Sequence, residues 1–298
     1  MSEKHPIVAV TGSSGAGTTT VKVAFEHLFR RENIKPLVIE GDSYHAYDRQ
    51  EMKAAIDKFA AEGKQLSHFG PDANLFGKLA DTFKEYGESG SCERRYYLHS
   101  DEEAAEHNAR LSLNNVPGQF TPWEKISEET DLLFYEGLHG GAKDGDIDVS
   151  AHTDLLIGVV PIVNLEWIQK IHRDTSQRGY SAEAVTDTIL RRMADYVHYI
   201  TPQFSQTDIN FQRVPTVDTS NPFIARDIPT PDESFIVIRF KDPAKSCVDF
   251  PYLLNMIDGS FMSRRNSIVV PGGKMGFAME LILNPVIHDL IEKKKKGD

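Results

Sequence analysis

The 298-residue sequence contains little cysteine, no long apolar run and no excess of positive charge. Its two cysteines, Cys92 and Cys247, lie far apart and outside any CxxC pattern, so neither a disulfide framework nor a zinc site is expected, and a reduced, cytoplasmic location is indicated. The longest apolar stretch, residues 155–163, is much shorter than the about 20 residues that cross a bilayer, so we expect no membrane-spanning segment. The formal net charge of -11 argues against a nucleic-acid partner, because Lys and Arg supply that affinity.

Apolar runs alternate with segments of helical periodicity through the first two thirds of the chain. A strand, a helix and a second strand near the start of the chain form a βαβ unit, which implies a parallel sheet. Nearly continuous apolar runs are typical of strands buried on both faces, and they occupy residues 7–10, 37–39, 132–135 and 155–160. Helical spacing is found after residue 20, over 49–86 with a break near 69–71, from residue 165, over 182–199 and over 276–292.

After Pro202 the pattern changes. Residues 214–217 and 235–240 are predicted strands that add to the sheet in antiparallel orientation. The sequence contains no internal repeat and no low-complexity linker. We therefore predict an α/β fold with a mixed, mostly parallel sheet flanked by helices, in a single domain over residues 1–298 whose C-terminal extension begins at about residue 202.

A glycine-rich turn, GSSGAGTTT at residues 12–20, separates the first strand from the helix that follows it. In this context glycines let backbone N–H groups surround phosphate oxygens, and the helix N-terminus adds its positive dipole end. Thr19 occupies the Ser/Thr position that binds Mg²⁺, but Thr18 stands where the GxxxxGK[ST] pattern has lysine, so another cation must approach the phosphates. The turn predicts a P-loop kinase fold that binds ATP and Mg²⁺ through Gly12, Ser13, Ser14, Gly15, Ala16, Gly17, Thr18, Thr19 and Thr20.

Two carboxylates come at the ends of buried strands, where the ligand crevice of an open α/β sheet lies. Glu136 ends the third apolar run and is a predicted Mg²⁺ ligand together with Thr19, although a local turn cap is the alternative. Asp42 ends the second run and could accept the proton of an attacking hydroxyl, although it could instead cap a helix. His45 and Arg49 follow Asp42 by three and seven residues, so on a helical turn they would share a face suited to a phosphate-bearing substrate.

A basic cluster is predicted on the helix after the fourth apolar run. Lys170, Arg173, Asp174 and Arg178 are spaced i, i+3, i+4 and i+8, which places them on one helical face. One interpretation is a solvated face with weak ion pairs. The other is a lid that supplies the positive charge missing at Thr18 and excludes water from the reaction.

Longer stretches of the sequence resemble the phosphoribulokinase family in its bacterial, NADH-regulated form. The resemblance covers essentially the whole chain. The P-loop alone indicates only a nucleotide, whereas residues 164–174 and 203–212 are far more specific. The matching stretches are GSSGAGT at 12–18, EGD at 40–42, FYEGLHG at 134–140, NLEWIQKIHRD at 164–174, QFSQTDINFQ at 203–212 and SNPFIAR at 220–226.

The resemblance implies ATP- and Mg²⁺-dependent phosphorylation of the 1-hydroxyl of D-ribulose 5-phosphate to ribulose 1,5-bisphosphate, a Calvin cycle reaction. It implies Asp42 as the catalytic base and Asp174 as a second essential acid, with Thr19 and Glu136 as metal ligands. The substrate contacts that it implies are His45, Arg49, Tyr97, His99, Lys170 and Arg173, and the basic cluster adds Arg178 as a further substrate-binding candidate.

The resemblance also implies a homo-oligomer that NADH activates and AMP inhibits, with Arg31, Arg239 and Arg264 in the effector site. Plant members of the family are switched through a P-loop cysteine, and Ser13 and Ser14 leave no such cysteine here. Two other functions stay open. One is a uridine-kinase-like or pantothenate-kinase-like enzyme on the same fold, and the other is a nucleotide-dependent switch protein that binds ATP without phosphorylating a metabolite.

Overall fold

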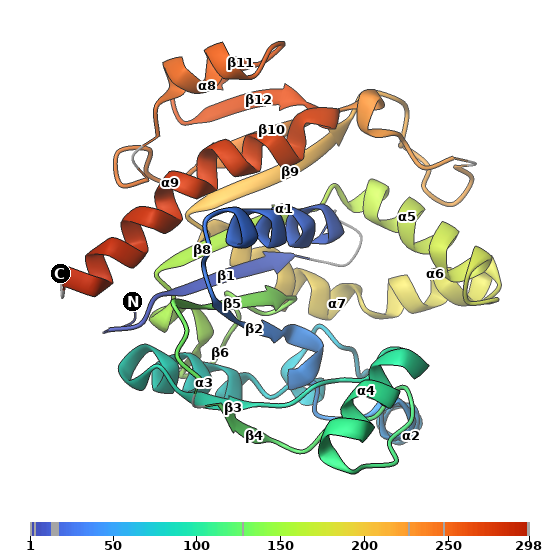
Figure 1. Ribbon diagram of the computed structural model, residues 1–298. Coiled ribbons are helices and arrows are strands. Elements are labelled where there is room, and N and C mark those ends of the chain that lie inside the picture. Colours follow the sequence, from blue (N-terminus) through green and yellow to red (C-terminus); the bar gives the residue numbers. More distant parts are fainter. Residues whose placement is uncertain are drawn as a thin grey trace.

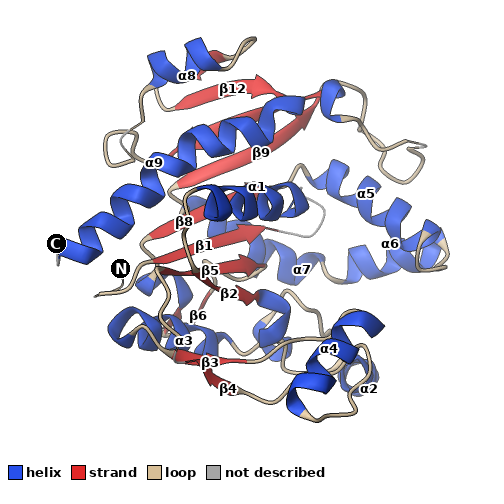
Figure 2. Ribbon diagram, viewed as in Figure 1, coloured by secondary structure: helices blue, strands red, loops and turns tan. Residues whose placement is uncertain are grey.

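A central eight-stranded sheet organises the molecule, and helices cover both of its faces (Figure 1, Figure 2). The computed structural model describes residues 2, 4–12, 18–126, 128–225, 227–246 and 248–296, with the backbone alone for residues 18–20. Residues 13–17, which hold most of the predicted P-loop, and Cys247 lie outside the described residues. The arrangement confirms the predicted α/β class.

Parallel strands form the larger part of the sheet, and antiparallel strands extend it at one edge. The parallel strands are, in spatial order, β2 (Pro36–Glu40), β5 (Leu132–Gly137), β1 (Ile7–Gly12), β8 (Leu155–Val160) and β9 (Ile209–Pro215). The antiparallel strands are β10 (Ser234–Phe240), β12 (Ser267–Pro271) and β11 (Phe261–Arg264). The predicted runs in the first half of the chain are all strands, because parallel strands covered on both faces require unbroken apolar sequence.

The prediction for β9 was wrong in position and in direction. The strand begins at Ile209 rather than at residue 214, and it runs parallel to β8 with Ile157 opposite Ile209. The helices between the two strands form a crossover connection, which returns the chain in the same direction. Sequence analysis missed β11, a short and largely exposed edge strand, and β12 beside it.

Two hydrophobic layers sandwich the parallel strands. Val8 and Val10 of β1 face the layer formed with α1 (Thr18–Arg31) and α9 (Met275–Lys296). Ile7 and Ala9 face the opposite layer, which α3 (Phe76–Ser89) covers. Alternation of side chains along a strand sends these pairs to opposite faces. No helix in the described part of the chain combines the length and the apolarity needed to span a bilayer.

The predicted helices are present but have more breaks than expected, and sequence analysis missed α4 and α8, which are given below. The predicted helix over residues 49–86 is two helices, α2 (Arg49–Ala61) and α3, and the segment between them is longer than expected. The predicted helix over 182–199 ends as α6 (Ala182–Arg191) and continues as α7 (Met193–Asp195) and a π-helical turn, Tyr196–Ile200. The other helices are α4 (Asp101–Leu111), α5 (Val163–Ser176) and α8 (Phe250–Met256), and the small antiparallel pairs are β3 (Cys92–Arg94) with β4 (Glu124–Ile126) and β6 (Lys143–Asp144) with β7 (Ile147–Asp148).

Two histidines lie beneath the carboxyl edge of the sheet, His139 buried and His68 half-buried. His139 is 3% exposed, contacts the Phe76 ring, and has its Nε2 3.2 Å from the Phe69 carbonyl oxygen. The His68 ring stacks on His45 at 4.4 Å. Desolvation lowers the pKa of both His139 and His68 to about 3, so both rings are neutral at neutral pH.

The buried His139 should make the free energy of unfolding fall in mild acid. In the unfolded chain its pKa returns to the ordinary 6.5, so below that pH the unfolded state binds the extra proton and is favoured. Between about pH 7 and about pH 5.5 this amounts to about 1 kcal/mol. Urea denaturation at the two pH values should show a smaller loss for His139→Gln than for the unchanged protein. Equal losses would contradict the prediction.

Candidate active site

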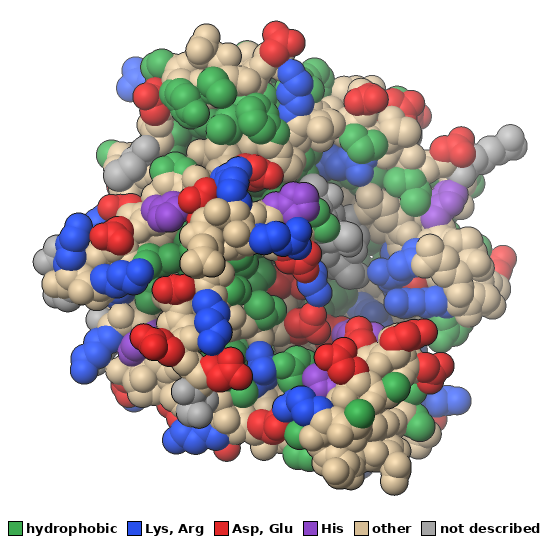
Figure 3. Space-filling model, in the orientation of Figure 1, with side chains coloured by type: hydrophobic (Ala, Val, Ile, Leu, Met, Phe, Trp, Pro, Cys, Tyr) green, Lys and Arg blue, Asp and Glu red, His purple; other side chains and the backbone are tan. Residues whose placement is uncertain are grey.

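The carboxyl ends of the parallel strands meet at one edge of the sheet, as the sequence predicted for its crevice. Gly12 ends β1 and packs so closely on Val159 that an added Cβ would lie 2.8 Å from the Val159 carbonyl oxygen. The predicted P-loop connects this point to Thr18, the first residue of α1. Figure 3 shows the molecule hollowed on this side, between the part formed by α5 and α6 and the part formed by α4, with basic side chains on the α5 and α6 wall.

Acidic side chains crowd the ends of β2 and β5. Glu40 and Glu136 are paired in register, and Asp42 follows Glu40 in a 3-10 turn, Gly41–Tyr44. Burial, the charge of Glu40 and, to a smaller extent, that of Asp42 raise the pKa of Glu136 to about 7, and Lys22 of α1 acts against them. The ammonium of Lys22 lies 2.9 Å from Glu40. Sequence analysis missed Lys22, which lies one helical turn after Thr18.

Glycines allow this crowding. A Cβ on Gly41 would lie 2.8 Å from the Gly137 Cα and 2.7 Å from the Tyr135 hydroxyl. The ends of β2 and β5 therefore approach each other more closely than two residues with side chains could. The close approach brings Asp42 and Glu136 to the same part of the crevice, as predicted, although Asp42 lies in the turn after β2 rather than at its last residue.

Asp42 is surrounded by imidazole rings. His45 Nε2 lies 3.2 Å from its Oδ1, and His99 Nε2 lies 3.9 Å from its Oδ2. Desolvation opposes the charge of Asp42, but the hydrogen bond from His45 and the charges of His45 and His99 outweigh it and lower the pKa of Asp42 to about 2. Tyr97 contacts both rings edge-on, at 6.4 Å from His45 and 4.9 Å from His99. The structure thus brings together four of the predicted site residues.

Arg49 does not share a helical face with His45, and this part of the prediction was wrong. His45 has extended backbone after the 3-10 turn, whereas Arg49 is the first residue of α2. Asp48 caps that helix with its side chain, which separates the two segments. The Arg49 side chain is exposed and lies along Gly118.

Arg95 supports the turn that carries Asp42, and sequence analysis missed it. Its guanidinium donates hydrogen bonds to the carbonyl oxygens of Ser43 at 2.7 Å and His45 at 2.6 Å. The same group stacks over the rings of Phe120 and Trp123, at 3.7 Å and 4.7 Å from their centroids. The only sequence signal for this role was an arginine next to aromatic residues, and that pattern occurs in many other roles as well.

The predicted basic cluster converges on one buried carboxylate. The side chain of Asp174 is 6% exposed and lies 2.6 Å from Lys170 Nζ, 3.0 Å from Arg173 Nε and 3.2 Å from Arg178 Nη1. Burial acts against its charge, but Lys170 and Arg173 outweigh burial and lower the pKa of Asp174. Since this carboxylate is withdrawn from water, the cluster is an organised ionic centre with an excess of positive charge rather than a solvated helical face.

The segment after α6 connects this ionic centre to residues 67–69, the loop whose His68 stacks on His45. Asp195 accepts a hydrogen bond from Ser67 Oγ at 2.6 Å, and Tyr196 contacts the Phe69 ring and donates to Glu166 of α5 at 3.0 Å. Arg192 acts electrostatically on both sides, because its charge affects the pKa values of Lys170 and His68. The helices of the proposed lid are therefore joined to the loop beneath Asp42.

The residues at this edge of the sheet suit a magnesium ion that takes only one or two ligands from the protein. Among the described residues no group of three or more His, Cys, Asp or Glu has the geometry to hold a metal. Mg²⁺ bound with a nucleotide commonly takes one or two protein ligands and fills its other positions with phosphate oxygens and water. Glu136 suits that role, because a divalent cation would stabilise the charge that burial and Glu40 disfavour. The side chain of Thr19, the other predicted ligand, lies outside the described residues.

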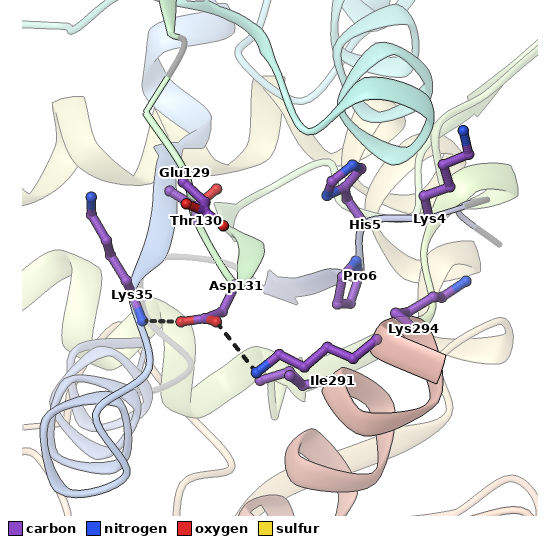
Figure 4. Close-up of a pocket in the computed structure, with 10 residues that line it drawn as sticks. Lys4, His5, Pro6, Lys35, Glu129, Thr130, Asp131, Ile291 and Lys294 are labelled. Atoms are coloured by element: carbon purple, nitrogen blue, oxygen red, sulfur yellow. Dashed lines mark hydrogen bonds and ion pairs between the residues drawn. The ribbon is translucent and has the colours of Figure 1, made fainter. Parts of the chain in front are cut away.

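A second cleft lies at the opposite end of the strands and is a poor candidate for catalysis. Its lining includes Lys4, Lys35, Lys294 and Lys295 near the starts of β1 and β5 (Figure 4). Lys295 Nζ lies 3.8 Å from Asp131, Lys294 Nζ lies 3.4 Å from Asp154, and Lys35 Nζ lies 3.6 Å from Glu128. Most of the positive charge around this cleft is therefore already paired.

The three arginines predicted for an effector site do not meet within one chain. Arg239 and Arg264 are both in register with Ser267, so they lie in one row across β10, β12 and β11. Arg31 ends α1 and pairs with Glu280 of α9 at 2.7 Å, on the face that these helices cover. Arg239 alternates with Ile236, Ile238 and Phe240, which point to the helices, so it lies on the other face.

Comparisons with known proteins agree with the fold. A model of the "Phosphoribulokinase / Uridine kinase family" matches residues 7–220. The chain is 58% identical to a phosphoribulokinase of Nitrobacter vulgaris over 298 residues, 100% of both chains, and 59% identical to the chromosomal phosphoribulokinase of Cupriavidus necator, over 100% of this chain and 99% of that one. It superposes on the solved phosphoribulokinase from Rhodobacter spheroides with a TM-score of 0.88 and 54% identity, over 99% of this chain and 100% of the other. The chain belongs to the phosphoribulokinase and uridine kinase family.

Proposed function

We propose that this chain transfers the γ-phosphoryl group of ATP to the 1-hydroxyl of D-ribulose 5-phosphate and so forms ribulose 1,5-bisphosphate for the Calvin cycle. The observation that carries the proposal is the Asp42 site, in which an ionised carboxylate lies beside two histidines at the carboxyl edge of a sheet that also carries the P-loop. Full-length identity of 58% to a named phosphoribulokinase supports the same reaction. A uridine-kinase-like activity is less favoured, because a nucleoside has no phosphate for these histidines to bind.

Asp42 is the proposed catalytic base. Its low pKa keeps it ionised at neutral pH, and its Oδ2 has a longer, weaker contact than its Oδ1 and can turn to the substrate hydroxyl. His45, Tyr97 and His99 are proposed to bind the sugar phosphate beside it. Arg49 is proposed as an outer contact that would need to turn inward from the α2 end of the crevice.

Lys170, Arg173 and Arg178 are proposed to supply the cations that the P-loop lacks at Thr18. Asp174 holds these side chains together, and its single negative charge leaves the group net positive. Phosphoryl transfer is catalysed mainly by positioning and by charge stabilisation, so a lid with this charge could act on the γ-phosphoryl group directly. Magnesium bound with the nucleotide, at Glu136 and Thr19, would neutralise further phosphate charge.

Substrate preference tests the proposed reaction. In an ADP-coupled assay, ribulose 5-phosphate should give a kcat/KM far above those of ribose 5-phosphate, uridine and pantothenate, because the site binds both the phosphate and the attacking hydroxyl. Asp42→Asn, purified in parallel, should lower kcat by about 10²–10⁴-fold and so exclude a contaminating kinase. Equal turnover of uridine would contradict the proposal, as would ATP hydrolysis that needs no sugar phosphate.

Charge removal at Lys170 tests the lid. Lys170→Met should lower kcat/KM by about 10²–10³-fold, as does loss of other groups that stabilise transition-state charge. Lys245→Met, at an exposed lysine away from the crevice, is the matched control and should leave kcat/KM unchanged. Thermal melting should show that both variants fold. If Lys170→Met keeps near-normal activity, the cluster is only a structural ion-pair network and the proposed lid is wrong.

Regulation by NADH is proposed from the resemblance, together with a homo-oligomeric state and a cytoplasmic location. NADH should raise the rate without being oxidised, and Arg31→Ala should weaken this response while basal activity persists. Arg30→Ala is the control, because Arg30 is the exposed neighbour on the same helix. A rate that does not change over an NADH titration would remove the claim, and sedimentation of the purified chain would measure its assembly.

A further inference from the structure

The His45 ring is held from both sides. Its Nδ1 lies 2.8 Å from Oδ1 of Asn74, and its Nε2 lies 3.2 Å from Oδ1 of Asp42. Asn74 is 6% exposed, and its backbone pairs with that of His45 in an antiparallel bridge. Two further backbone hydrogen bonds, from Ala46 to Ala73 and from Leu75 to Tyr44, extend this pairing. Asn74 is therefore fixed to the turn that carries Asp42, although it comes from a different part of the chain.

The hydrogen bonds of Asn74 determine which way its amide points. Its Nδ2 donates to the carbonyl oxygens of His68 at 2.9 Å and Gly70 at 2.7 Å. Carbonyl oxygens only accept, so the amide nitrogen must face them and Oδ1 must face His45. An amide oxygen also only accepts, which means that His45 Nδ1 carries a hydrogen. With Nδ1 bound to Asn74, Nε2 is the ring nitrogen that faces Asp42 and the crevice.

We propose that Asn74 is a positioning residue for phosphoryl transfer, because its side-chain oxygen holds the His45 ring with Nε2 directed at Asp42 and the crevice. The inference rests on the proposed function and goes further, since it explains how the site keeps a ring nitrogen oriented toward a phosphorylated substrate. When the sugar phosphate enters, a hydrogen on Nε2 is directed at a phosphate oxygen. Charge-assisted hydrogen bonds of this kind are about twice as strong as neutral ones.

The groups around His45 are compatible with this orientation of its ring. Asp42 and His99 face it from the crevice, Tyr97 contacts its edge, and His68 stacks on it. His68 and the deeper His139 are neutral, because burial lowers the pKa of each to about 3, so they add no positive charge at neutral pH. Arg95 binds the His45 carbonyl oxygen rather than its ring. The His45 ring is therefore held by Asn74 on one side and faces Asp42 on the other.

A double-mutant cycle tests whether Asn74 acts through His45. Asn74→Leu keeps the side-chain size but removes the acceptor, and it should lower kcat/KM for ribulose 5-phosphate by about 10- to 100-fold, as expected for a hydrogen bond to a charged group. Its KM for ATP should be unchanged. In a His45→Phe background the same substitution should change kcat/KM by less than about 3-fold, because the interaction is already lost. Thr82→Val, which removes a hydrogen bond from Tyr44 of the same turn, should leave the KM for ribulose 5-phosphate unchanged in both backgrounds.

Equal losses in the two backgrounds would overturn the inference, because Asn74 would then act only on general stability. A crystal structure of Asn74→Leu gives a measure that does not depend on activity, since His45 Nε2 should leave hydrogen-bond distance of Asp42. If leucine prevents folding, Asn74→Ala serves in both experiments. A ring that stays in place in the variant would also overturn the inference. If the protein without any substitution does not phosphorylate ribulose 5-phosphate, the proposed function is contradicted instead. The crystal structure of the Asn74 variant would still decide whether Asn74 positions His45.

Discussion

Acidic side chains must share the end of one strand pair, and the rest of the site compensates for their mutual repulsion. Parallel pairing of β2 with β5 sets Glu40 beside Glu136, and the approach of Gly41 to Gly137 brings Asp42 to the same edge. Burial and the neighbouring charges raise the pKa of Glu136 to about 7. A site with this much negative potential cannot receive an anionic nucleotide unless cations accompany it.

The compensating cations come from separate elements, some at the sheet edge itself and some on helices that face it. Lys22 extends from α1 to Glu40, and His45 and His99 contact Asp42 from loops. Lys170, Arg173 and Arg178 belong to a second ionic centre around Asp174. The acidic side chains thus lie at the rigid sheet edge, whereas the excess of positive charge lies on the helices across the hollow in Figure 3. This division suits a kinase, because a base needs fixed geometry whereas charge around the phosphoryl group can be delivered on closure.

The turn that carries Asp42 obtains its rigidity from outside itself. Asn74 holds the His45 ring, and Arg95 holds the carbonyl oxygens of Ser43 and His45 while two aromatic rings cover its guanidinium. Each support is buried or stacked, where a hydrogen bond to a charged group is stronger than in water. Neither support touches the reacting atoms, yet both decide where the base and the neighbouring His45 ring lie.

The sequence by itself determined four of the five parallel strands, the position of the glycine-rich turn between β1 and α1, the convergence of Asp42 with Glu136 and the one-sided cluster around Asp174. These features have short-range signatures, because a buried parallel strand requires a continuous apolar run and a helix brings residues four apart together. The tertiary structure alone decided the direction of β9, the separation of Arg49 from His45, and the supporting roles of Asn74 and Arg95. Asn74 contacts His45 across 29 residues and Arg95 across 50, through loops without periodicity. Such contacts depend on how distant segments pack, and no local pattern of burial encodes them.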